Sequence, residues 1–394
     1  MATELAPAQL LTGGEAVAEA MCQIDPDVVP IYPITPQTPI IQGFAKAVAD
    51  GRAHGELIDV ESEHSAMSAS IASALAGART MTATSSQGLA LMAEVVYIAA
   101  SMRAPVVMAL GNRALSGPIN IHCDHSDSML IRDSGAIQLF AENAQEAYDL
   151  TVIAPRLAEH PDVLLPVLVC QDGFTITHSA EPVTLLDDAE VREFVGEYRI
   201  PYPLLDLSRA TTQGPFAMPD YYYELRRQQA AAIEGALGVF EEIAAEFAEV
   251  TGRRYGSVEP YHLDDAERAL VCLGSTAGTA KDVVDELRAE GEHVGLLKIT
   301  SFRPLPAEKI HDLLRTTDAV AVLDRADSPG GEPPLYAEVA VALSGEAPEL
   351  RTYVYGLGGR DLHPEDLRQV FAGTAPHYVG LRNDVGLRSE PCPA

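Results

Sequence analysis

The spacing of apolar residues along the first 180 positions predicts short buried strands separated by amphipathic helices. Runs rich in β-branched and other apolar residues, each expected to form a strand, lie at 27–31, 57–60, 79–85, 105–110 and 163–170. Segments with helical spacing of apolar positions lie at 12–24, 40–49, 88–102 and 144–157. Strands that alternate with helices form parallel sheets covered on both faces, so we expect an α/β fold.

The pattern changes at residue 181. Residues 181–220 are rich in proline and predict an extended, irregular excursion, which a long helix follows at 221–250. Residues 251–264 look like a linker. Beyond it, apolar runs predict strands at 269–273, 294–299, 319–323 and 352–355, and helical spacing predicts helices at 281–290, 307–315, 336–343 and 364–371. We therefore expect two α/β domains, at 1–250 and 265–394.

The stretch from residue 57 to residue 89 has the character of a ligand site. A predicted strand is followed by Glu61 and Glu63, and then by a helix rich in alanine and serine that Gly77 closes. The next predicted strand ends in Ser85-Ser86-Gln87-Gly88. Ligands of α/β proteins gather at the carboxyl ends of the strands, so these polar residues are candidates for a binding site.

A second candidate element follows the first predicted strand, at Tyr32–Pro39. Its three prolines rule out continued helix or strand and fix the backbone around Thr35. Two interpretations remain open from spacing alone. Thr35 is either a rigidly held hydroxyl at a strand end or part of an ordinary proline-rich connection.

Composition excludes several classes of protein. The chain of 394 residues has a formal charge of −30, which argues against binding to nucleic acid or to an anionic membrane surface. No apolar run is as long as a membrane span, and the N-terminus lacks the basic start of a signal peptide. We therefore expect a cytoplasmic protein. Lysine is scarce beside arginine, and composition cannot separate salt adaptation from a GC-rich genome.

The cysteines and the polar segment 119–133 are possible metal ligands, but their spacing disfavours a metal. The five cysteines are scattered without a CxxC motif, so we expect buried, reduced thiols and no metal cluster. The polar segment contains His122, Asp124, His125 and Asp127, whose spacing fits no common ligand pattern. We interpret it as a loop that shapes a neighbouring pocket. The glycine-bearing stretch 274–279 lacks phosphate-loop and dinucleotide spacing, and an ordinary strand-to-helix turn explains it better.

Several motifs, taken together and in order, give the chain a family resemblance over nearly its whole length. They are Tyr32-Pro-Ile-Thr-Pro36, the Glu63 segment, Ser86-Gln-Gly-Leu89, Asn112-Arg-Ala-Leu-Ser-Gly-Pro-Ile-Asn-Ile121, Asp124-His-Ser-Asp127, Ala141-Glu-Asn-Ala-Gln-Glu146 and Gly356-Leu-Gly-Gly-Arg-Asp361. With these motifs the chain resembles the α subunits of 2-oxoacid:ferredoxin oxidoreductases, especially the pyruvate branch. Glu63-His-Ser-Ala-Met67 is also similar to the corresponding run of transketolase-type pyrimidine domains.

The resemblance implies a thiamine diphosphate site and a role for each candidate residue. It implies a transketolase-like pyrimidine-binding domain followed by a transketolase C-terminal-like domain. Glu63 matches the glutamate that activates the cofactor through its pyrimidine ring, and Gln87 and Gly88 would line the same pocket. Arg113 and Thr35 match substrate-binding residues, because a planar guanidinium suits the carboxylate of a 2-oxoacid. The alternatives are a helix-dipole role for Glu63 and a structural ion pair for Arg113.

The chain also lacks parts that such an enzyme needs. It contains no Gly-Asp-Gly motif for the diphosphate and Mg²⁺, and no cluster-binding cysteines. The resemblance therefore implies a β subunit with the diphosphate site, together with γ- and δ-type subunits that carry [4Fe-4S] clusters. The expected reaction is reversible oxidation of pyruvate with CoA to acetyl-CoA and CO2, with ferredoxin as electron carrier. Alternatives are oxalate, an aryl glyoxylate or 2-oxoglutarate as substrate, a non-redox transketolase-type enzyme, or a subunit with a decayed site.

Overall fold

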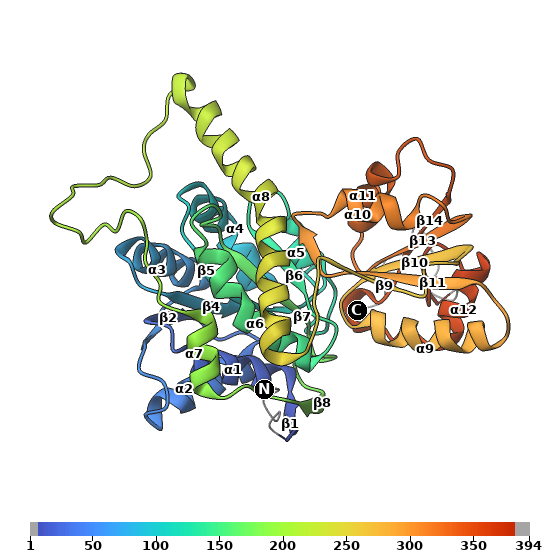
Figure 1. The fold of residues 1–394 in the computed structure, drawn as a ribbon, viewed down its shortest axis with the longest axis horizontal. Coiled ribbons are helices and arrows are strands. Elements are labelled where there is room, and N and C mark those ends of the chain that lie inside the picture. The colour runs from blue at the N-terminus through green and yellow to red at the C-terminus, as the bar shows by residue number, and fades with distance from the viewer. Residues whose placement is uncertain (1–6, 383–394) are drawn as a thin grey trace.

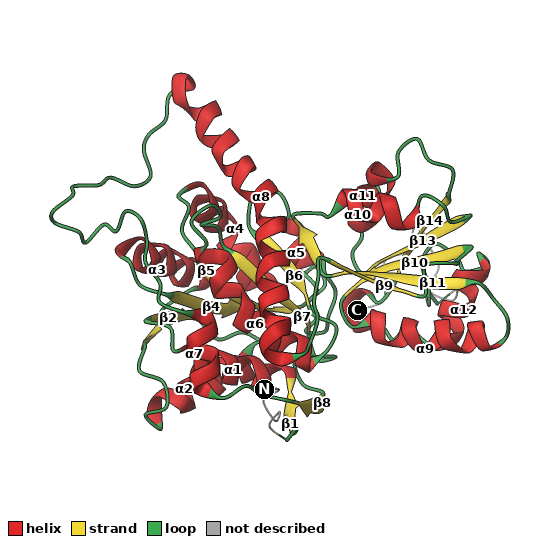
Figure 2. Ribbon diagram, in the orientation of Figure 1, coloured by secondary structure: helices red, strands yellow, loops and turns green. Residues whose placement is uncertain are grey.

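The computed structural model describes residues 7–382 and contains two mainly parallel α/β sheets, connected by the long helix α8 (Pro219–Thr251) (Figures 1 and 2). The larger sheet has seven strands in the order β12-β6-β7-β5-β4-β2-β3, and all neighbours are parallel except β12 and β6. Its strands are β2 (Val28–Ile31), β3 (Glu56–Asp59), β4 (Thr80–Thr84), β5 (Val106–Asn112), β6 (Ile137–Phe140), β7 (Val167–Asp172) and β12 (Ser301–Arg303). The expected α/β class is confirmed.

Helices cover both faces of this sheet because its strands are apolar on both sides. Along β5, Val107 and Ala109 join the core cluster packed by α1, α2 and α6, whereas Val106, Met108 and Leu110 face the cluster packed by α3 and α4. The covering helices are α1 (Gly13–Ile24), α2 (Thr38–Ala49), α3 (Glu63–Ala76), α4 (Ser86–Ser101) and α6 (Ala144–Glu159). This two-sided burial is what a continuous apolar strand predicts.

The smaller sheet has five strands in the order β14-β13-β10-β11-β9, of which only β9 is antiparallel to its neighbour. Its strands are β9 (Val258–Tyr261), β10 (Arg268–Leu273), β11 (Val294–Ile299), β13 (Ala319–Asp324) and β14 (Glu349–Val354). Its helices are α9 (Thr276–Ala289), α10 (Ala307–Leu314), α11 (Pro334–Ala342) and α12 (Pro364–Ala372). Leu297 and Ile299 of β11 belong to the same core cluster as α3 and α4, so the two sheets share apolar packing.

Two predictions from the sequence need correction, and some strands were not predicted. The predicted linker 251–264 contains β9, a short edge strand whose proline obscures its pattern. The predicted irregular excursion contains β8 (Ala180–Val183), which pairs with β1 (Gln9–Thr12), and α7 (Asp188–Val195). Strands β6 and β12 were not predicted, because the polar Gln138 interrupts the four-residue apolar run of β6 and β12 has only three residues.

Two further predictions can be compared directly with the structure. Four cysteines are free and buried, as expected, whereas Cys392 lies outside the described residues, as does the start of the N-terminal segment. No helix within residues 7–382 is both long and apolar enough to cross a membrane.

Candidate functional site

The candidate residues named from the sequence all lie at the carboxyl ends of neighbouring strands of the larger sheet. Thr35 follows β2, Glu63 begins α3 after β3, Gln87 and Gly88 lie in the first turn of α4 after β4, and Arg113 follows β5. Because the strands β3, β2, β4 and β5 are adjacent and parallel, their carboxyl ends meet at one edge of the sheet. The topology therefore gathers these residues from four separate places in the sequence.

Glu63 is the first residue of α3 and is nearly buried, with 7% of its surface exposed. Ser62 caps the helix by accepting a hydrogen bond from the amide of Ser65 at 3.2 Å. The start of α4 approaches closely: a Cβ on Gly88 would stand 2.8 Å from Glu63 Oε1 and 2.4 Å from Thr84 Oγ1. Glycine is therefore required at residue 88 for Glu63 to keep its place.

Arg113 and Thr35 are in direct contact. Arg113 Nη1 donates to the carbonyl oxygen of Thr35 at 3.0 Å, and Nε donates to the carbonyl oxygen of Asn120 at 2.8 Å. The side chain is 6% exposed, and burial lowers the pKa of the guanidinium. Both of these hydrogen bonds go to backbone carbonyls, which carry no net charge. They therefore orient the Arg113 guanidinium without neutralising its positive charge. This arrangement suits an anionic ligand better than the alternative of a structural ion pair.

Asp127 connects two of these loops, a role that was not predicted from the sequence. Its Oδ2 accepts hydrogen bonds from the amides of Ser86 and Arg113, each at 2.9 Å. Its Oδ1 accepts from Asn112 Nδ2 at 2.9 Å. The carboxylate is fully buried, and this burial raises its pKa to about 6 in spite of the donors. The family motif pointed to Asp127, but only the fold reveals its partners. The segment 119–133 thus shapes the candidate site, as the sequence predicted.

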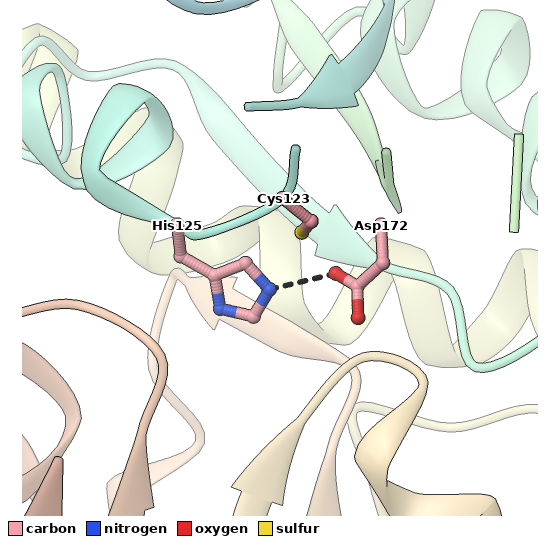
Figure 3. Close-up of side chains that lie close together, drawn as sticks. All are labelled: Cys123, His125 and Asp172. Carbon is pink, nitrogen blue, oxygen red and sulfur yellow. Dashed lines mark hydrogen bonds and ion pairs between the residues drawn. The ribbon is translucent and has the colours of Figure 1, made fainter. Parts of the chain in front are cut away.

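A second buried cluster contains Cys123, His125 and Asp172 (Figure 3). Asp172, the last residue of β7, accepts hydrogen bonds from His125 Nε2 at 2.7 Å and from Arg325 Nη1 at 2.8 Å. Burial opposes its ionisation, but the charges of Arg325 and His125 outweigh burial and hold the pKa of Asp172 far below its usual value. Figure 3 shows Cys123 next to this pair, with the possible ligand atoms of Cys123, His125 and Asp172 within 4.8 Å of one another. A metal ion would have to compete there with the Arg325 guanidinium, so the cluster fits an ion pair better than a metal.

The stretch 274–279 also meets Asp172. The amide of Ser275 donates to Asp172 Oδ2 at 3.0 Å, and the Ser275 hydroxyl donates to the same oxygen at 2.5 Å. The amide that a phosphate would need is therefore bound by a carboxylate of this chain. The geometry agrees with the interpretation of this stretch as an ordinary turn.

Several buried polar atoms at the end of β4 and the start of α4 have no partner within the described residues. They are Thr84 Oγ1, Ser85 Oγ and Gln87 Nε2. Buried hydroxyls and amides are costly when they lack a hydrogen-bond partner, so their presence indicates that a polar group binds here. A carboxylate beside hydroxyl and amide groups matches the donors and acceptors of an aminopyrimidine ring, so these residues fit the thiamine half of thiamine diphosphate.

Comparison with known proteins also indicates a thiamine diphosphate-binding domain. Residues 19–245 match the family model "Pyruvate flavodoxin/ferredoxin oxidoreductase, thiamine diP-bdg", and residues 266–367 match "Pyruvate:ferredoxin oxidoreductase core domain II". The chain is 60% identical to pyruvate synthase subunit PorA of Thermotoga maritima over 94% of this chain and 97% of the relative. It is 40% identical to ketoisovalerate oxidoreductase subunit VorA of Pyrococcus abyssi over 92% of each chain.

Solved structures show the same fold. A 2-oxoglutarate:ferredoxin oxidoreductase from Magnetococcus marinus superposes with a TM-score of 0.75 at 20% identity, over 93% of this chain and 65% of that chain. A split-gene transketolase superposes with a TM-score of 0.55 at 15% identity, over 92% of this chain and 97% of that chain. Because the first family model covers more than half of the sequence and the relatives cover nearly all of it, the chain belongs to the pyruvate flavodoxin/ferredoxin oxidoreductase family.

Proposed function

We propose that this chain is the α subunit of a pyruvate synthase and supplies the pyrimidine-binding half of a thiamine diphosphate site. The assembly would oxidise pyruvate with CoA to acetyl-CoA and CO2, reversibly, and pass the electrons to ferredoxin. The observation that carries the proposal is the convergence of Glu63, Gly88, Thr35 and Arg113 at one sheet edge. The 60% identity to a pyruvate synthase subunit supports pyruvate as the substrate.

Glu63 is proposed to bind the pyrimidine ring of the cofactor. Thiamine diphosphate, when bound, supplies the carbon nucleophile that attacks the 2-oxo group. The nearly buried Glu63 carboxylate would hold a proton at a ring nitrogen, which favours the tautomer that activates the cofactor. Gln87, whose amide nitrogen has no partner among the described residues, and Gly88, which leaves room beside Glu63, would complete the pocket.

Arg113 and Thr35 are proposed to bind the substrate. The Arg113 fork is held by two backbone carbonyls and keeps its positive charge, so it can receive the carboxylate of a 2-oxoacid. The contact between Arg113 and the Thr35 carbonyl also fixes Thr35 beside the guanidinium. Its exposed side chain then lies near the position that a bound oxoacid would take.

The remaining parts of the enzyme are proposed to come from partner chains. A β subunit would hold the diphosphate and Mg²⁺, and γ- and δ-type subunits would carry the [4Fe-4S] clusters. The curated relatives are themselves named as subunits, which supports a hetero-oligomer. We also propose that residues 1–250 form the pyrimidine domain and 265–394 a transketolase C-terminal-like domain. The free, buried cysteines in the described part of the chain suit the cytoplasm.

A related oxoacid is the second candidate for the substrate. The 40% identity to a ketoisovalerate oxidoreductase subunit favours a branched 2-oxoacid among the alternatives. The test is anaerobic viologen reduction by the native assembly, with pyruvate, ketoisovalerate, 2-oxoglutarate, oxalate or phenylglyoxylate, each with and without CoA. We expect reduction that requires both pyruvate and CoA. Preference for another oxoacid would replace the substrate, and no reduction by a cluster-loaded assembly would refute the proposed activity.

A further inference from the structure

Asp127 lies between two elements that the proposed function assigns to different ligands. One of its oxygens accepts hydrogen bonds from the amides of Ser86 and Arg113. Ser86 begins the helix whose first turn contains Gln87 and Gly88, on the cofactor side of the site. Arg113 is on the substrate side. Asp127 Oδ2 therefore accepts backbone hydrogen bonds from both the cofactor side and the substrate side of the site.

The other oxygen fixes the orientation of the carboxylate. Asp127 Oδ1 accepts from Asn112 Nδ2 at 2.9 Å and from the amide of Ser128 at 2.8 Å. With donors on both oxygens, the buried carboxylate has no freedom to turn. Ser86 is held in an unusual backbone conformation, with φ of 48°, and its bond to Asp127 helps to maintain it.

The turn that carries Asp127 is itself held by the smaller sheet. The amide of His125 donates to the carbonyl oxygen of Arg325 at 2.8 Å, and His125 Nε2 bonds Asp172, which in turn pairs with the Arg325 side chain. Arg325 directly follows β13. Asp172 of the larger sheet and Arg325 of the smaller sheet therefore both hold His125, which directly precedes α5 (Ser126–Leu130).

We propose that Asp127 is a positioning residue that sets the substrate-binding Arg113 and the cofactor-binding turn at Ser86–Gly88 in one fixed arrangement. This inference rests on the proposed function, because that function assigns the two loops to substrate and cofactor. Loss of the carboxylate charge would release both loops together. A variant of Arg113 alone or of Gln87 alone would weaken the binding of one ligand only.

The experiment uses the full assembly with Asp127→Asn in this chain. An amide cannot accept hydrogen bonds on both of its terminal atoms, so one set of donors loses its acceptor. We expect the KM for pyruvate and the dissociation constant for thiamine diphosphate, measured by calorimetry, each to rise about tenfold, the size of one charge-assisted hydrogen bond. Asp149→Asn is the matched control, because Asp149 is equally buried but pairs with Arg253 and Tyr255. The control should lower the melting temperature and leave both constants unchanged.

The outcomes separate positioning from stability. If Asp127→Asn lowers the melting temperature as the control does but changes neither constant, or only one, the proposal is wrong. If that variant does not fold, Asn112→Ala, which removes one donor to the same carboxylate, should raise both constants by a smaller factor, and unchanged constants would overturn the proposal. If the unaltered assembly binds the cofactor but oxidises no 2-oxoacid, the proposed function fails. In that case, the thiamine diphosphate dissociation constants of the wild type and of Asp127→Asn still test whether Asp127 positions the cofactor-binding turn.

Discussion

Arg113 Nη1 donates a hydrogen bond to the backbone carbonyl of Thr35 at 3.0 Å, across 78 positions of sequence. The contact forms because β2 and β5 flank β4 in a parallel sheet, so the loops after them meet at its carboxyl edge. Two residues selected separately from sequence motifs are therefore neighbours. Their contact uses the Thr35 carbonyl, which leaves the threonine hydroxyl available to a ligand.

We expect Arg113→Lys to raise the KM for the oxoacid by roughly tenfold or more, with a smaller effect on kcat. Lysine keeps the charge but loses the planar fork that binds a carboxylate through two hydrogen bonds. Arg103→Lys is the control, because Arg103 is also partly buried and donates to backbone carbonyls, at Val163 and Leu164, remote from the site. Steady-state kinetics of the assembly give the KM and kcat of both variants. An unchanged KM in the Arg113 variant would make Arg113 a structural residue.

Glu63→Gln should lower turnover by about two orders of magnitude or more, because a neutral amide cannot take the place of the carboxylate in proton transfer. Glu61→Gln is a close control. Glu61 lies two residues away and is exposed, and its Oε1 accepts a hydrogen bond from Ser65 Oγ at 2.6 Å. The control should retain nearly full activity. Near-normal turnover of an intact Glu63→Gln assembly would reduce Glu63 to the helix-dipole role.

Gly88→Ala tests the packing between the starts of α3 and α4. The added methyl group would collide with Thr84 Oγ1 and Glu63 Oε1, so the carboxylate must move from its place. We expect weaker thiamine diphosphate binding and lower turnover in the assembled variant. Gly238→Ala in α8 adds the same group where no atom of residues 7–382 lies within 4 Å, and it should leave activity unchanged and raise stability by up to about 1 kcal/mol. Equal behaviour of the two variants would contradict the close approach at Gly88.

Much of this site could be predicted from the sequence because its local patterns are strong. Ser62 before α3 and Gly77 after it, the latter with φ of 109°, are standard helix boundaries, and β-branched runs mark the central strands. The motifs that contain Glu63 and Arg113 each follow a predicted strand, so both residues were expected at strand ends. These features depend on residues that are close together in the chain.

The interactions that hold the site in place could not be predicted in the same way. The pair of Asp172 and Arg325 joins residues 153 positions apart, and no periodicity in the sequence links them. Asp127 was visible as part of a motif, but its bond to the amide of Ser86 depends on how two strands lie side by side. Short strands such as β12 gain their structure from the neighbouring sheet rather than from their own composition.

Asp324 gives a prediction about stability and pH. Its carboxylate accepts hydrogen bonds from the amides of Leu335 and Tyr336 at the start of α11, at 2.9 and 2.8 Å. Burial is the largest influence on this group and raises its pKa to about 7, although both amides favour the charged form. A carboxyl group whose pKa is raised in the folded state contributes stability below its unfolded pKa, and this contribution is lost as the pH rises through about 7.

The wild-type chain should therefore lose stability relative to Asp324→Asn as the pH rises, because the amide does not titrate. Between pH 5 and pH 8 the difference in unfolding free energy should change by about 2–3 kcal/mol in favour of the variant. Denaturant unfolding of the full chain at several pH values measures this. Asp265→Asn is the control: the hydrogen bond from Arg288 lowers the pKa of the exposed Asp265 to about 2, so its difference from wild type should stay constant over this range. A constant difference for Asp324→Asn as well would mean that the α11 amides keep Asp324 ionised throughout.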